Sequence, residues 1–230
     1  KMTVNQYNRT GISIQVGLSG YSFKVYDGEG VSPSGWLTPE HLFSSPQMQR
    51  RYDEVEISVF THKCALVPSQ FFSETSAAAM LAEVCALNEG DPVEWVSVDD
   101  AAAVLVYSNA IGETLSKVVS ETVLMTDGSK ARPLPEMYYI LKDLPRLSDY
   151  NRILASYVDG VLYLAIAQGK SLLLCNTYKA QDFTTAEYFI FLAMKKLQLN
   201  PEVSTICFRT PLDEEEEMSL YRYFKNVEQI

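Results

Sequence analysis

Two short glycine turns are the parts of this sequence whose residue types suit chemistry on phosphates. The first is Ser19-Gly20, and the second is Gln168-Gly169-Lys170. Small turn residues let backbone N–H groups approach phosphate oxygens, and a lysine adds positive charge. The second turn continues into Ser171, but the phosphate-binding loop GxxxxGK[ST] requires glycine at position 164, which is Leu164. A β-hairpin turn explains these residues better than a phosphate loop does.

Two further patterns resemble catalytic motifs without completing them. GLSGY at 17–21 differs from the nucleophile elbow GxSxG because its last residue is Tyr21. His62 lies close to Cys64 in the chain, but the sequence offers no third group to orient a cysteine-histidine pair. We interpret both patterns as structural, so we name no catalytic residue.

The charge of the chain argues against nucleic acid as a partner. Lys and Arg number 19 against 29 Asp and Glu, which gives a formal net charge of -10. An acidic surface repels phosphate backbones unless basic residues gather locally, and here the pairs Arg50-Arg51 and Lys195-Lys196 stand alone. We therefore expect neither nucleic acid nor an anionic membrane to bind.

Cysteine and histidine usage predicts no metal site and a reducing compartment. The four cysteines are widely spaced, none lies in a CxxC pair, and there are only two histidines. Four reduced thiols favour the cytoplasm. The longest apolar runs, such as VLYLAIA at 161–167, fall far short of the roughly 20 residues of a membrane helix. The polar start KMTVNQYNRTG contains no secretory signal.

The chain contains an internal repeat. GISIQVGLSGYSFKVYD at 11–27 and GVLYLAIAQGKSLLLCN at 160–176 each predict a β-hairpin, and both glycines keep a constant offset of 149 residues. VEISVF at 55–60 matches VSTICF at 203–208 as a later strand. Between the hairpin and this later strand, each copy has room for a third strand and a helix. The expected helix lies around 44–52 in the first copy and begins at Thr184 in the second. The repeat therefore predicts a β-β-β-α-β unit that occurs twice.

The residues between the two copies predict additional α/β structure. The expected elements are a strand and turn at 65–72, a helix at 73–87 with Ser73 as N-cap, a strand within 101–109, a helix at 110–120, a loop at 126–135, and a helix from 136 towards 156 that Pro145 breaks. The acidic run 213–217 is typical of the start of a helix. A docking surface for a basic partner is the alternative interpretation of that run.

The duplication, with the turn GLSGYSF, the segment CALVPSQFF and the second hairpin, resembles an uncharacterised family of Bacteroidetes proteins with the actin-like ATPase fold. That family is related in architecture to the actin-like assembly protein of type IV pili. The resemblance implies a duplicated, ribonuclease H-like α/β fold with two β-β-β-α-β halves and mixed sheets. It implies a first domain at 1–156 with inserted α/β elements, and a second, shorter domain at 157–230.

The resemblance also implies where nucleotide chemistry would lie, and the sequence departs from it there. In active members, the first strand of each half contributes an aspartate beside magnesium. The first position falls on Gln15, followed by Gly17, and the second falls on Ala165, with Ala167 at the glycine. Active members also carry a late glycine pair against the adenosine, but no glycine follows Gly169. We therefore expect no cofactor.

These departures favour a non-catalytic scaffold that binds an unidentified protein or peptide. The alternative is a divergent ATPase or small-molecule kinase that binds a nucleotide with magnesium in the inter-domain cleft. Either function would use the cleft between the halves. We expect that cleft to include Gln15, Ser19, Gly20, Gln168, Gly169 and Lys170.

Overall fold

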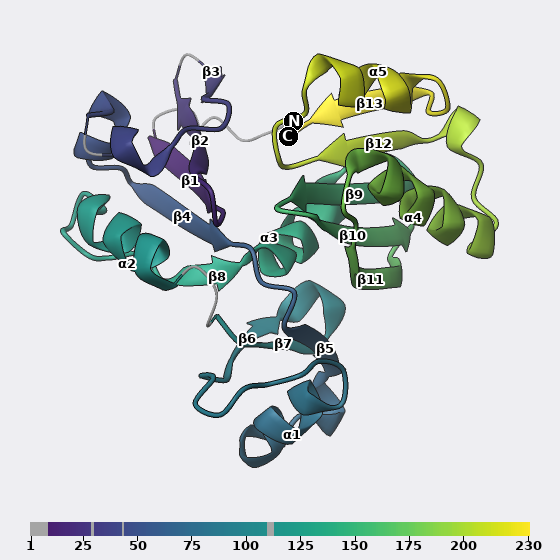
Figure 1. The fold of residues 1–230 in the computed structure, drawn as a ribbon, viewed down its shortest axis with the longest axis horizontal. Coiled ribbons are helices and arrows are strands. Elements are labelled where there is room, and N and C mark those ends of the chain that lie inside the picture. The colour runs from purple at the N-terminus through teal and green to yellow at the C-terminus, as the bar shows by residue number, and fades with distance from the viewer. Residues whose placement is uncertain (1–8, 29, 43, 110–112) are drawn as a thin grey trace. The chain divides into compact units, whose positions relative to one another are not determined.

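The computed structural model of the chain describes residues 9–28, 30–42, 44–109 and 113–230 (Figure 1). Contacts within the chain define two compact units. Unit 1 comprises Lys1–Phe60 and Ala110–Leu134, and unit 2 comprises Thr61–Asn109 and Pro135–Ile230. The domain boundary expected after residue 156 stays a prediction. It separates the two copies of the repeat in the sequence, whereas the two units are defined by contacts in space. No described helix is long and apolar enough to cross a membrane.

Unit 1 is built on a five-stranded mixed sheet with the order β3-β2-β1-β4-β8. Its strands are β1 (Gly11–Val16), β2 (Tyr21–Asp27), β3 (Gly30–Pro33), β4 (Glu54–Val59) and β8 (Pro133–Pro135). β1 pairs antiparallel with β2 and parallel with β4. Alternate residues of β1 enter a core that is closed by Val119 of α2 (Glu113–Thr122) and by Val123, which directly follows this helix. This alternation is the one that predicted the strand.

Unit 2 contains a second five-stranded sheet with the order β11-β10-β9-β12-β13. Its strands are β9 (Asn151–Val158), β10 (Val161–Gln168), β11 (Ser171–Lys179), β12 (Thr205–Phe208) and β13 (Asn226–Gln229). One face packs against α4 (Phe183–Lys196) and α5 (Glu214–Tyr221), and Figure 1 shows α4 running across the strands. Helix α3 (Glu136–Asp143) contacts β9 and β10. Asp213 caps α5 in a capping box with Glu216, so the acidic run does begin a helix.

The segment between the two large sheets forms a three-stranded sheet with the order β5-β7-β6. Its elements are β5 (Cys64–Pro68), α1 (Ala77–Ala82), β6 (Glu94–Val98) and β7 (Ala103–Tyr107). Two predicted elements are confirmed here, the strand followed by a turn and the strand within 101–109. The predicted helix 73–87 is much shorter in the structure, where α1 covers only Ala77–Ala82. Ser73 instead precedes a 3-10 turn at Glu74–Ser76, and its hydroxyl hydrogen-bonds that of Thr75 at 2.9 Å without capping. Of the predicted helix 110–120, residues 110–112 lie outside the described residues.

The prediction of a helix from 136 towards 156 is wrong in its second half. Helix α3 ends at Asp143, a 3-10 turn follows at Leu144–Arg146, and β9 begins at Asn151. β9 is a central strand that is buried on both faces, so it lacks the alternation that marks a strand with one wet face. The predicted helix around 44–52 is likewise only the 3-10 turn Pro46–Gln49.

The repeat is real, but its register differs from the predicted one by one strand. The two sheet orders make β9 the equivalent of β1, and β10 the equivalent of β2. The counterpart of the β1–β2 turn at 17–20 is therefore Asp159-Gly160, which joins β9 to β10. The turn at Gly169-Lys170 joins β10 to β11 and lies at the other end of the strands. The hairpin at 160–176 therefore consists of the second and third strands of its half.

Candidate functional site

Gln15 lies near the end of β1 on the side of the sheet opposite the α2 core. Its side chain is only 4% exposed, and the hydroxyl of Ser22 on β2 donates to its Oε1 at 3.1 Å. This neighbour is set by the register of the hairpin, which places Gln15 directly opposite Ser22. The position that the resemblance assigns to a metal-directed carboxylate thus holds a buried, hydrogen-bonded amide.

Ser19 and Gly20 belong to a four-residue connection instead of the two-residue turn that the sequence predicts. The N–H of Gly17 donates to the carbonyl of Gly20 at 2.8 Å, and β2 begins at the next residue. A Cβ atom at Gly20 would lie 2.2 Å from the carbonyl oxygen of Leu37. Glycine is required here by the close approach of two backbones, and phosphate binding is not needed to explain it.

Gln168 and Gly169 contact the start of β9 in unit 2. The Gln168 side chain donates to Asn151 at 3.1 Å, and the Gly169 N–H donates to the carbonyl of Tyr150 at 2.8 Å. The Gly169 carbonyl accepts from Arg152 Nη1 at 2.9 Å. Lys170 completes the turn and is exposed. These three residues are therefore together, whereas Gln15, Ser19 and Gly20 belong to unit 1. A cleft shared by both groups stays a prediction.

The second predicted aspartate position was placed on the wrong strand. Ala165 and Ala167 are on β10, which is the second strand of this half. From the sequence, β10 is assigned as the first strand because β9 is not predicted. The correct strand, β9, reads NRILASYV and contains no carboxylate. Neither β1 nor β9 therefore supplies an acidic group. The expectation that the first strand of each half lacks an aspartate for magnesium is the same for β9 as it was for Ala165.

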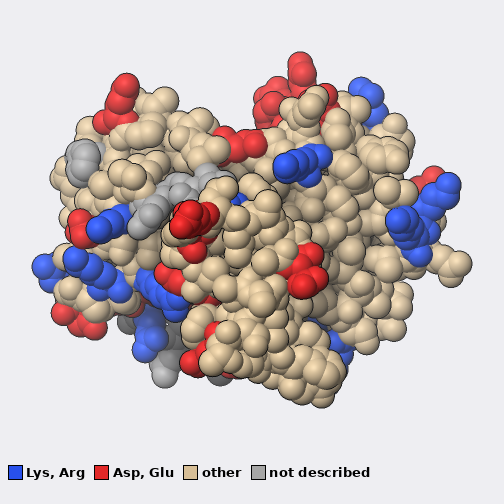
Figure 2. Space-filling model, turned by 60° about the horizontal axis from the view of Figure 1, so that its bottom comes forward, with Lys and Arg blue, Asp and Glu red and all other residues tan. Residues whose placement is uncertain are grey.

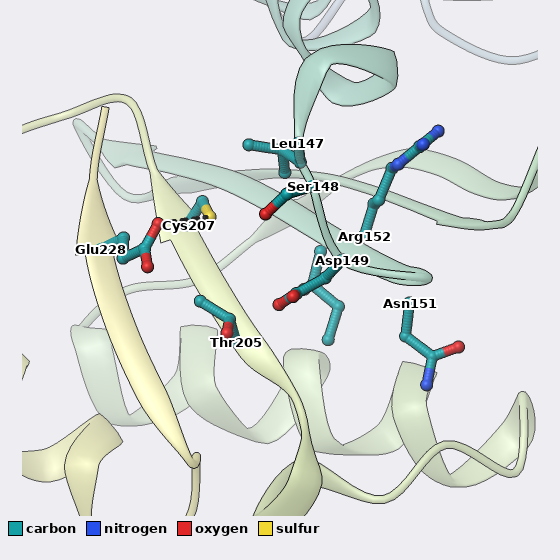
Figure 3. Close-up of a pocket in the computed structure, with 9 residues that line it drawn as sticks. Leu147, Ser148, Asp149, Asn151, Arg152, Thr205, Cys207 and Glu228 are labelled. Carbon is teal, nitrogen blue, oxygen red and sulfur yellow. Dashed lines mark hydrogen bonds between the residues drawn. The ribbon is translucent and has the colours of Figure 1, made fainter. Parts of the chain in front are cut away.

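A shallow pocket lies at the start of β9, where Asn151 and Arg152 contact the turn at 168–170 (Figure 3). Its wall combines the loop at 147–149 with residues of β9, β12 and β13. Ser148 and Asp149 point towards Thr205, Cys207 and Glu228, whereas the guanidinium of Arg152 points away from them (Figure 3). The pocket is therefore acidic. Among the described residues, no group of three or more His, Cys, Asp or Glu side chains is arranged to hold a metal ion.

The thiol in this pocket is not set up as a nucleophile. Burial, together with the nearby carboxylates of Glu228 and Asp149, raises the pKa of Cys207 to about 12. Burial also raises the pKa of Cys175 to about 12 and that of Cys64 well above its ordinary value. A thiol with such a pKa is protonated near neutral pH, and only the thiolate attacks.

We expect Cys175 and Cys207 to react slowly with iodoacetamide at pH 8.5 in the folded chain and quickly in urea. An unfolded cysteine has a pKa near ~8.5, so unfolding exposes thiols that ionise. By the same linkage, these thiols favour the folded state fully below about pH 8.5, and this contribution is lost as pH rises towards about 12. Mass spectrometry of alkylated peptides measures the rates. Equal rates in folded and unfolded chains would contradict the assignment.

A buried ionic network in unit 2 was not visible in the sequence. Glu136 of α3 is fully buried, and its Oε1 accepts from Arg209 Nε at 3.0 Å and from the Ser156 hydroxyl at 2.6 Å. The Arg209 guanidinium also pairs with Asp143 and lies over the ring of Tyr139. Because Glu136 and Arg209 are far apart in the chain, only the fold brings them together. The network fixes Ser156 on β9 and joins α3 to the end of β12.

Charged side chains are dispersed on the face shown in Figure 2. Several blue groups lie near one another at the left of this view with red groups among them, and wide uncharged areas separate the remaining charges. This distribution is consistent with the low count of basic residues. The expectation that nucleic acid does not bind stays a prediction.

Comparisons with known proteins agree with this architecture. A Bacteroides thetaiotaomicron protein with an actin-like ATPase fold and unknown function is 16% identical, with a TM-score of 0.65 over 100% of this chain and 94% of that one. The PilM-PilN type IV pilus biogenesis complex is 10% identical, with a TM-score of 0.48 over 96% of this chain and 88% of that one. No curated protein matches.

The first of these similarities confirms the actin-like ATPase fold and says nothing of activity, because its identity is low and its function is unknown. The mixed sheets of the two units are those of this fold. A family model described as a protein of unknown function (DUF3822) matches residues 1–227. The chain therefore belongs to the DUF3822 family.

Proposed function

We propose that this protein is a non-catalytic member of the actin-like fold that binds a protein or peptide partner. The observation that supports the proposal most strongly is the environment of Gln15. Its buried amide stands where active members place an aspartate, and it accepts a hydrogen bond from Ser22 at 3.1 Å. Magnesium with a nucleotide needs carboxylate oxygens at this point, and a neutral amide supplies no charge.

The second half offers no replacement for the missing carboxylate on its first strand. β9 contains no Asp or Glu, and the hydroxyl of Ser156 is already committed to Glu136. Glu136 is itself paired with Arg209. The residues of β1 and β9 therefore do not fit a magnesium-bound nucleotide, and we derive no phosphoryl-transfer step.

Exposed apolar side chains on unit 2 support a role in binding. Tyr188 on α4 is 60% exposed, and Met218 on α5 is 62% exposed. Tyr223 is also exposed, and its ring contacts that of Phe191 with centroids 4.9 Å apart. Tyrosine and methionine are enriched at protein interfaces, where their exposed surface becomes buried.

We expect MgATP, MgADP and MgGTP at millimolar concentration to leave the melting temperature unchanged. A ligand present at ~100 times its dissociation constant stabilises a protein by about 2.7 kcal/mol, so even modest affinity would produce a clear shift. Differential scanning fluorimetry measures it, and omission of magnesium is the control. A magnesium-dependent rise with one nucleotide would favour the divergent ATPase or kinase instead.

The binding role is tested by affinity capture followed by reconstitution. The tagged chain is used to isolate a partner from its native cells, and that partner is then purified separately. We expect the two to form a complex of fixed stoichiometry in size-exclusion chromatography with light scattering. Repeated capture under varied salt and pH that yields no reconstitutable partner would contradict the proposal.

A further inference from the structure

Strand β11 is a long, unpaired edge of the sheet in unit 2. It has nine residues, Ser171–Lys179, and among the described residues it pairs only with β10. The other edges of the two five-stranded sheets are much shorter, with four residues in β3, three in β8 and four in β13. Short edge strands are one way in which proteins avoid unwanted pairing, and a long edge is a template for another strand.

On the side away from β10, no other strand of the part of the chain that the structure describes pairs with β11. A bulge shifts the register between Ile166 and Ala167, and beyond it Leu174–Lys179 pairs regularly with β10. Within this stretch the N–H of Thr177 donates to the side chain of its neighbour Asn176 at 2.9 Å. This amide is therefore outside the ladder, and a side-chain oxygen occupies the place where a partner's carbonyl would accept.

The surroundings of β11 favour one kind of occupant. Lys170 and Lys179 lie at its two ends, both are exposed, and neither has an ion-pair partner among the described residues. Antiparallel pairing of β11 with its own copy would bring these lysines near one another, and like charges across strands are destabilising. An extended segment with acidic ends avoids that repulsion.

Aromatic side chains extend from β11 onto α4. The ring of Tyr178 stacks on Phe189 with centroids 4.7 Å apart, and Phe189 contacts the exposed Tyr188 at 5.4 Å. An added strand beside β11 would place its own alternate side chains next to this aromatic row. Strand addition of this kind combines backbone hydrogen bonds with side-chain contacts that give specificity.

We propose that an extended segment of a partner protein adds to β11 as an edge strand over Ser171–Lys179, with regular pairing along Leu174–Lys179. We further propose that Lys170 and Lys179 select acidic residues at its ends. This inference rests on the proposed binding role and names the surface and chemistry of the partner. It assigns no role to the pocket beside Cys207.

A designed peptide tests the surface directly on the full chain. The probe is a nine-residue peptide with two glutamates at each end and alternating threonine and valine between them. We expect a dissociation constant of ~1 mM or tighter, with at least ~10-fold slower amide hydrogen exchange within 174–179 at saturation. A peptide with lysines in place of the glutamates should bind about fivefold more weakly, as expected for exposed charge pairs.

Thr177→Pro is the decisive variant because it removes an amide that lies outside the β10 ladder. Proline is tolerated at sheet edges where its missing N–H faces solvent, so the fold should persist and peptide binding should be lost. Thr177→Val keeps the amide and should bind as the original chain does. If Thr177→Pro fails to fold, Lys170→Glu with Lys179→Glu replaces it and should reverse the preference between the two peptides.

Four results with the peptides or with the free chain would overturn the inference. They are no protection of 174–179 by millimolar peptide, unchanged binding by folded Thr177→Pro, no reversal of peptide preference by the double lysine variant, or a dimer of the free chain that protects these amides. The last result would make a second copy the occupant. A purified natural partner that binds Thr177→Pro normally would refute strand addition at β11 and leave the proposed binding role intact.

Discussion

Arg209→Ala is expected to lower the free energy of unfolding by about 3–5 kcal/mol, because it leaves a buried carboxylate without its cation. Glu136 is fully buried and receives Arg209 Nε at 3.0 Å. The same substitution also removes one of the two arginines that pair with Asp143, which keeps Arg146 at 3.1 Å, and removes the guanidinium from the ring of Tyr139. Urea denaturation followed by circular dichroism measures the change, and hydrogen exchange assigns it to unit 2.

The matched control is Lys130→Ala, which removes an ion pair with Glu121 at 3.8 Å in which both side chains are more than half exposed. Exposed pairs contribute about 0–1 kcal/mol, so this variant should unfold nearly as the original does. The double variant Glu136→Leu with Arg209→Met should recover part of the lost free energy of unfolding, because position 136 then carries no buried charge. Equal small effects of Arg209→Ala and Lys130→Ala would contradict the network.

Gly20→Ala should destabilise unit 1 by about 1–3 kcal/mol, the usual range for forcing extra atoms into a packed site. The added Cβ would lie 2.2 Å from the carbonyl oxygen of Leu37, which is backbone and cannot rotate away. That carbonyl accepts the N–H of Tyr21 at 2.9 Å, so moving it weakens the pairing of the start of β2 with the segment that follows β3. Thermal unfolding and hydrogen exchange of β2 amides measure the effect.

Gly11→Ala is the control because it makes the same change in the same sheet without a clash. The nearest atom to its Cβ would be the Glu54 carbonyl oxygen at 3.6 Å, an ordinary contact. Glycine inside a strand is less stable than alanine by about 0.5–1 kcal/mol, so this variant should be neutral or slightly stabilising. If Gly20→Ala behaves as Gly11→Ala does, the close approach of Leu37 is not the reason for glycine at position 20.

Local patterns were enough to predict most of the fold. The alternation of Ile12, Ile14 and Val16 identified β1, and the helix expected from Thr184 is α4, which Asp182 caps through Thr185. The duplicated α/β architecture followed from the two hairpins and the later strand in each half. These features depend on neighbours in the chain, which a sequence displays directly.

The features that could not be predicted from the sequence depend on residues far apart in the chain. β9 is buried on both faces and follows an apolar helix, so its residues carry no period that distinguishes strand from helix. Because β9 was not predicted, the strands of the second half were assigned one position too late. The aspartate position was therefore assigned to Ala165 on β10 instead of to a residue of β9. The pair of Glu136 with Arg209 and the pocket beside Cys207 likewise join separate segments, which no local pattern reports.

We propose that this protein keeps the actin-like fold without phosphoryl-transfer chemistry. Phosphate release from MgATP by the purified chain tests it most directly, with a protein-free reaction and a Gln15→Ala variant in parallel. We predict that all three release phosphate at the same background rate, because neither β1 nor β9 supplies a carboxylate for magnesium. Release that scales with protein concentration and falls in Gln15→Ala would contradict the claim.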